Sequence, residues 1–127
     1  MNHTSLEQSN KLINVGLNTN TADMYHWESE GKIYTYVGKC SDPNGVPCWT
    51  VDALINVLPT SIIHDDVFYQ LVTFHDLGVI EYINLDKNEI LYSSVWNALS
   101  PKTYGYIHGL YKMVLWCLKE GHIKKGE

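Results

Sequence analysis

Arginine is absent from this chain of 127 residues, in which all nine basic side chains are lysines. Arginine supplies the planar fork of donors that best recognises phosphates and guanine edges. The formal net charge is −5, and Lys124-Lys125 is the only adjacent cationic pair. Nucleic acid is therefore an unfavoured partner, and the chain lacks the basic stripe that such proteins carry.

Long hydrophobic runs are absent as well. No apolar stretch approaches the roughly 20 residues that span a bilayer. The opening MNHTSLEQSNK is polar and has no signal-peptide core. The sequence also lacks G-x-G-x-x-G and P-loop patterns, which excludes the common phosphate cradles. We therefore expect a cytoplasmic protein with reduced thiols and no membrane partner.

What is present is typical of one globular domain covering residues 1–127. The composition is 45% hydrophobic and 18% charged, and a chain of this length buries roughly two-thirds of its surface. Such a core needs no disulfide or metal. We expect residues 1–4 to be disordered and residues 122–127 to form a flexible tail.

The first element predicted is a helix over residues 5–15. Ser5 and Gln8 have the spacing of a capping box, and Gly16 is suited to a left-handed helix stop before Leu17. A polar stretch follows, and IYTYV at residues 33–37 has the β-branched and aromatic content of a strand.

The segment CSDPNGVPCWT, residues 40–50, reads as a turn that leads into a helix. Residues 42–45 (DPNG) fit a type I turn, and Thr50 is a good N-cap. Trp49 and Leu54 have the spacing of a hydrophobic staple, and Pro59 bars continuation. We expect structural roles for these residues in a two-turn amphipathic helix.

The second half predicts an antiparallel meander of three strands over residues 66–94, with turns at 75–78 and 86–88. A last helix ends near Glu120, and its inner stripe is Ile107, Tyr111, Val114 and Leu118. Its start is left open between Ser100-Pro101 and Gly105. Trp116 is expected to be structural. The fold class expected is α+β, a meander with the C-terminal helix packed on it.

Metal binding and catalysis are not favoured by these residues. Cys40 and Cys48 are spaced more widely than a C-x₂₋₄-C zinc knuckle, and no second pair completes them. His64, His75 or Cys117 could complete a site only if the fold brought them close to this pair. Cys48 lies ahead of a helix cap but lacks a nucleophile signature. We therefore predict no metal, no cofactor and no catalytic residue.

Two carboxylate groupings are candidate acid/base pairs. Asp65-Asp66 and Glu28-x-Glu30 are simpler as polar turns than as catalysts.

A binding role remains, and Tyr25, His26, Trp27 and Trp96 are its candidate surface because tyrosine and tryptophan favour interfaces. The partner would be another protein or a second copy in a homodimer. The alternative is a small DNA-associated regulator, with a helix-turn-helix whose second helix begins near Thr21.

Three blocks resemble small uncharacterised proteins of Bacteroides-type gut bacteria, their phages and mobile elements. They are TSLEQSNKLINVGL with TADMY, then PCWTVDALINVLP, then YKMVLWCLKEGHI, and together they cover roughly half of the chain. The resemblance implies no known activity. In that family the position of Cys48 is often alanine, and an Asx-x-Pro entry replaces Tyr104-Gly105-Tyr106. The resulting prediction is a non-catalytic interaction or homo-oligomerising accessory protein of a phage or mobile element.

Overall fold

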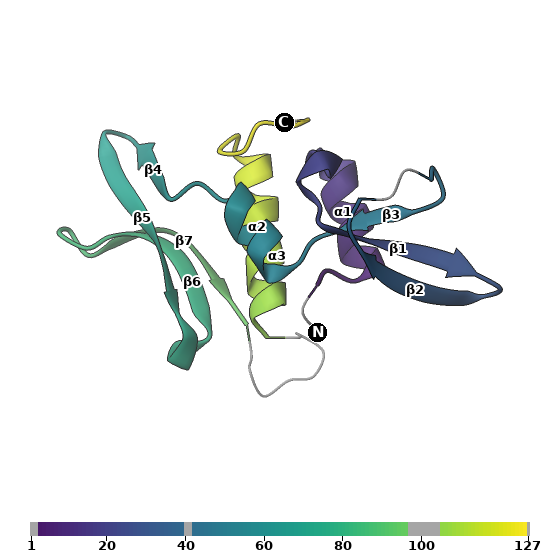
Figure 1. Cartoon of the computed structure of the whole chain (residues 1–127). Helices are drawn as coiled ribbons and strands as arrows, with labels where there is room; N and C mark the ends of the chain where they lie inside the picture. The colour runs from purple at the N-terminus through teal and green to yellow at the C-terminus, as the bar shows by residue number, and fades with distance from the viewer. Residues whose placement is uncertain (1–2, 40–41, 97–104, 127) are drawn as a thin grey trace.

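The computed structural model describes residues 3–39, 42–96 and 105–126. Within them the chain forms an α+β fold in which two antiparallel sheets flank the helices α2 and α3 (Figure 1). The elements in order are α1 Leu6–Val15, β1 Met24–Ser29, β2 Lys32–Val37, β3 Val46–Cys48, α2 Val51–Val57, β4 Ser61–His64, β5 Val67–Phe74, β6 Val79–Asn84, β7 Glu89–Val95 and α3 Tyr106–Lys119. Two 3₁₀ turns lie at Thr19–Thr21 and His75–Leu77.

Local capping signals determine α1 as predicted. The Ser5 hydroxyl accepts from the Gln8 backbone N–H at 3.1 Å, and the Gln8 side chain accepts from the Ser5 N–H at 2.9 Å. Gly16 has a φ of +113°, and the Leu17 N–H donates to the Leu12 carbonyl at 2.9 Å. The capping box and the left-handed stop are both confirmed.

No α-helix begins near Thr21, so the expected helix-turn-helix is not formed there. One 3₁₀ turn leads directly into β1, where His26 is buried while Tyr25 and Trp27 are partly exposed. This alternation has the period of a strand, and it decides the local structure. β1 pairs with both β2 and β3, in the order β2-β1-β3. The strand predicted at 33–37 is confirmed as β2, whereas β1 and β3 were not predicted.

The turn over residues 42–45 and the helix α2 follow the prediction. The Gly45 N–H donates to the Asp42 carbonyl at 3.1 Å, which closes the turn. The Thr50 hydroxyl caps α2 by accepting from the Ala53 N–H at 3.2 Å. Leu54 is fully buried, and α2 ends at Val57, directly before Leu58 and Pro59.

The second sheet has the order β4-β5-β6-β7, which confirms the three predicted strands and adds β4. In the sequence of β4, only Ile62 and Ile63 favour a strand. β4 is stabilised by its antiparallel pairing with β5. The turn between β5 and β6 needs Gly78, whose φ is +64°. A methyl group there would lie 2.5 Å from the Trp96 carbonyl oxygen.

Helix α3 begins at Tyr106 and connects both halves of the molecule, since it contacts α1, α2, β6 and β7. The alternative start at Ser100-Pro101 lies outside the described residues. Tyr111, expected in the inner stripe, is only partly buried. The buried face of α3 is broader than the predicted stripe. It consists of Ile107, Gly109, Leu110, Met113, Val114, Cys117 and Leu118.

The described residues at both ends of the chain make contacts with the rest of the fold. His3 forms an antiparallel bridge with Thr50, and Thr4 is fully buried. Ile123 is buried, and the Gly126 N–H donates to the Gly16 carbonyl at 2.7 Å. Each segment is ordered because its backbone groups find partners in the core.

Trp49 is the residue whose removal should cost most stability. It is fully buried, and its indole N–H donates to the Thr21 hydroxyl at 2.9 Å. We expect Trp49→Ala to lower the free energy of unfolding by about 3–5 kcal/mol, because a cavity remains. Urea denaturation measures this loss. Val37→Ala, at a side chain that is 84% exposed, is the control and should change stability by under about 0.5 kcal/mol. Equal effects of the two substitutions would contradict this account.

Candidate functional site

The four aromatic residues proposed from the sequence as one surface lie in different places. Trp96 is buried near the start of α3, where Gly109 leaves room for its indole ring. His26 is buried on the side of the first sheet that faces α1. Tyr25 and Trp27 lie on the opposite, outer side of that sheet. Of the four, the structure brings only Tyr25 and Trp27 together.

Two tyrosines that the sequence analysis did not single out complete this outer surface. Tyr36 lies opposite Tyr25 across β1 and β2, and Tyr34 lies opposite Trp27. The rings of Tyr25 and Tyr36 stack with centroids 5.4 Å apart. We call these four side chains the aromatic face. The sequence signal for this face is the pair of alternating patterns YHW and YTY. When two such segments form a hairpin, their alternate aromatic side chains lie on the same side of the sheet.

Strand β2 is the outermost strand of the sheet, and little covers it. Tyr34 and Tyr36 are 45% and 46% exposed on the aromatic face. On the other side of the same strand, Ile33 and Val37 are 52% and 84% exposed. An edge strand with apolar side chains on both sides is unusual, because it offers free backbone groups and apolar area together.

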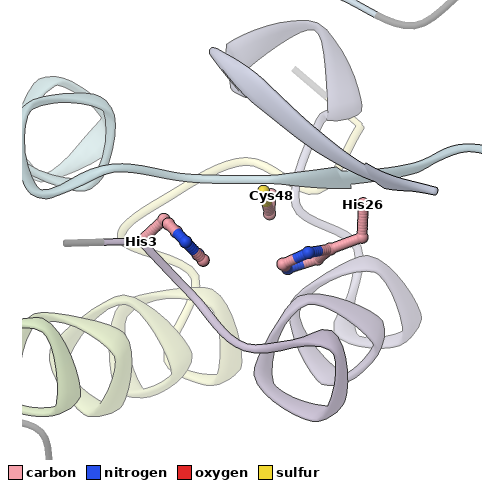
Figure 2. A group of neighbouring side chains, drawn as sticks. All are labelled: His3, His26 and Cys48. Carbon is pink, nitrogen blue, oxygen red and sulfur yellow. The ribbon is translucent and has the colours of Figure 1, made fainter. Parts of the chain in front are cut away.

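The inner side of the same sheet carries a second feature, the His–Cys cluster of His3, His26 and Cys48 (Figure 2). One ligand atom from each residue lies within 4.8 Å of the other two. His26 comes from β1, and Cys48 ends the neighbouring strand β3. His3 comes from the segment that bridges to Thr50. Three stretches distant in sequence therefore meet at one point.

Hydrogen bonds orient both imidazole rings of the cluster. The Nε2–H of His26 donates to the Thr4 carbonyl at 2.9 Å, and Nδ1 lies 2.9 Å from the Thr35 hydroxyl. Nδ1 of His3 lies 3.1 Å from the same Thr4 carbonyl. Burial lowers the pKa of His26, so its ring is neutral near pH 7.

The thiol of Cys48 is fully buried beside these rings. Burial, with the nearby Asp23 carboxylate, raises the pKa of Cys48 to about 12. Cys117 is buried on the other side of the core, where its thiol lies 3.8 Å from the Tyr82 hydroxyl. Burial raises its pKa to about 12 as well. Neither thiol has the depressed pKa of a nucleophile. Cys40 lies outside the described residues.

The remaining candidates have structural positions. Glu30 and the pair Asp65-Asp66 have positive φ values in hairpin turns, as expected of turn residues. Trp116 stacks on Tyr92 with ring centroids 4.5 Å apart. His64 and His75, considered as metal ligands from the sequence, are not members of the His–Cys cluster.

Among the described residues, no helix combines the length and apolar character required to cross a bilayer. No family model, curated protein or solved structure matches the chain. The resemblance to proteins of Bacteroides-type bacteria therefore stays a prediction, and function must be argued from the two sides of the first sheet.

The buried thiols generate a direct prediction. In a Cys40→Ser background, Cys48 and Cys117 should react with an aromatic disulfide reagent about a thousandfold more slowly than free thiols near pH 7. The reason is the rise in the Cys48 pKa from 9.0 to about 12. Absorbance of the released thiolate measures the rate. Unfolding in urea is the control, and both thiols should then react at the free rate. A native rate within tenfold of that value would contradict this prediction.

Proposed function

We propose that this protein is a non-catalytic interaction protein that forms a homodimer through the free edge of β2. The observation that carries the proposal is the exposed apolar character of both sides of this edge strand. The resemblance noted above would place such a dimer among the accessory proteins of phages or mobile elements. The protonated thiols of Cys48 and Cys117 and the turn positions of Glu30, Asp65 and Asp66 support a role without catalysis.

Of the two edges of the first sheet, β2 is the one suited to pairing. The opposite edge, β3, has three residues and contains Pro47, which has no N–H to donate to a further strand. β2 has six residues, and Lys32 at its start is its only charged side chain. Proline and charge are the usual protection of an edge, and β2 lacks both at its centre.

The sequence of β2 is also complementary to itself. In an antiparallel pair of two copies with Thr35 on the two-fold axis, Tyr34 lies opposite the second copy's Tyr36, and Ile33 lies opposite its Val37. Each apolar side chain therefore meets an apolar side chain, and Lys32 meets Gly38. The same patch serves both copies, as a two-fold interface requires. Pairing would extend the sheet to six strands and make one continuous aromatic face.

The expected dimer is weak and concentration-dependent. A six-residue ladder with eight apolar side chains is smaller than the roughly 1,600 Å² of a standard interface. Cross-strand pairs contribute about 0.2–1 kcal/mol each, and association costs translational and rotational freedom.

Sedimentation velocity over a concentration series tests the proposal. The parent chain should shift from monomer toward dimer as concentration rises. Val37→Lys should keep the chain monomeric, because an ammonium group would then lie opposite the apolar Ile33 of the second copy. The side chain of Val37 is 84% exposed, so folding should be unaffected.

Two further variants make the test specific to the register. Ile63→Lys is the matched control: Ile63 is 73% exposed on the edge strand β4, and the dimer should persist. Combining Ile33→Glu with Val37→Lys should restore association, because each carboxylate would lie opposite an ammonium group. A parent chain that is monomeric at every concentration would overturn the proposal. So would a dimer that is unaffected by Val37→Lys.

A further inference from the structure

The His–Cys cluster presents the donor atoms that bind transition metals. Imidazole nitrogen and cysteine sulfur suit zinc and its chemical relatives, whereas calcium and magnesium prefer oxygen ligands. The Asp23 carboxylate is not a member of the cluster, and it accepts hydrogen bonds from the backbone N–H and the hydroxyl of Thr50. The donor set is therefore two nitrogens and one sulfur.

The spacing of the cluster is close to that of a bound metal. In a tetrahedral zinc site, bonds of about 2.0–2.3 Å place neighbouring ligand atoms roughly 3.3–3.6 Å apart. The three ligand atoms here lie within 4.8 Å of one another. Closing the cluster requires movements of about 1 Å, which side-chain rotations of His3 and His26 can supply.

The hydrogen bonds of His26 are compatible with ligation. Thr35 offers a hydroxyl 2.9 Å from Nδ1, and a hydroxyl both donates and accepts. In the second tautomer, Nδ1–H donates to that hydroxyl. Nε2 then presents a lone pair to a metal once the ring turns away from the Thr4 carbonyl and the hydrogen bond to Thr4 is lost. A donor bond from the non-ligating nitrogen to an oxygen is the usual support of a metal-bound histidine.

We propose that His3, His26 and Cys48 bind one zinc-class transition-metal ion, with the Cys48 thiol releasing its proton to solvent as its sulfur binds the ion, and with a fourth coordination position left for water or an added ligand. His26 and Cys48 are buried, whereas His3 is only partly buried, so His3 marks the side from which the ion enters. The site joins the N-terminal segment to β1 and β3. It lies beneath the sheet whose edge carries the proposed dimer, yet it does not depend on that dimer.

Cobalt(II) is the probe that tests the site, because its complexes with thiolate absorb visibly and in the near ultraviolet. The full chain should bind one equivalent and develop a thiolate-to-cobalt band. Zinc should remove that band by displacing cobalt, since it binds such sites more tightly. Cys48→Ser should abolish the band, and Cys117→Ser, a buried cysteine outside the cluster, should retain it.

A second variant tests the site even if Cys48→Ser fails to fold. His3→Ala removes a partly buried ligand whose one described side-chain hydrogen bond goes to a backbone carbonyl, so the chain should stay folded by circular dichroism. Its cobalt affinity should fall by at least about tenfold. Cys40→Ser should leave the band intact.

Three results would overturn the proposal. The first is a folded parent chain with no thiolate-to-cobalt band at stoichiometric cobalt. The second is a band that survives Cys48→Ser or keeps full affinity in His3→Ala. The third is a band that requires Cys40 or Cys117. Because no outcome involves self-association, failure here leaves the proposed dimer untouched, and failure of the dimer leaves the site untouched.

Discussion

The burial of Trp49 is the constraint on which the first half of the structure depends. A tryptophan with no exposed surface must have its polar groups satisfied inside the protein. Thr4 meets that need for the backbone, because its N–H donates to the Trp49 carbonyl and its hydroxyl accepts the Trp49 N–H. The Thr4 carbonyl in turn holds His26. A segment that would otherwise be a free end is therefore part of the core, and it carries His3 into place.

The same sheet serves two chemically different surfaces because strand side chains alternate. On β1, His26 points inward while Tyr25 and Trp27 point outward, so imidazole and aromatic rings are one residue apart but on opposite sides. A shift of one residue in the pairing would exchange the two surfaces. The register with β3 also places Cys48 on the inner side. Both proposals thus rest on one set of strand pairings.

Sequence reasoning succeeded where the structure is decided by neighbours along the chain. The Ser5 capping box, the Gly16 stop, the turn at 42–45 and the Thr50 cap are short-range devices, and all are present. It missed β1 and β4, although each forms a hairpin with the next strand across a two-residue turn. It also missed the contacts between distant segments, namely the pairing of β1 with β3, the bridge from His3 to Thr50 and the hydrogen bond from Gly126 to Gly16.

The cysteine pair illustrates why the candidate site was harder to predict than the fold. Spacing rules for metal ligands apply to two donors in one loop, so the sequence pairs Cys40 with Cys48 as candidate ligands. The structure instead groups Cys48 with His26, across the pairing of β1 and β3, and with His3, through the bridge that joins His3 to Thr50. His3 and Cys48 are 45 residues apart in the sequence. Separations of that size leave no periodic trace in a single sequence. Long-range pairing, which local patterns do not encode, therefore determines the donor set beneath the sheet, whereas the aromatic face above it belongs to the local hairpin of β1 and β2.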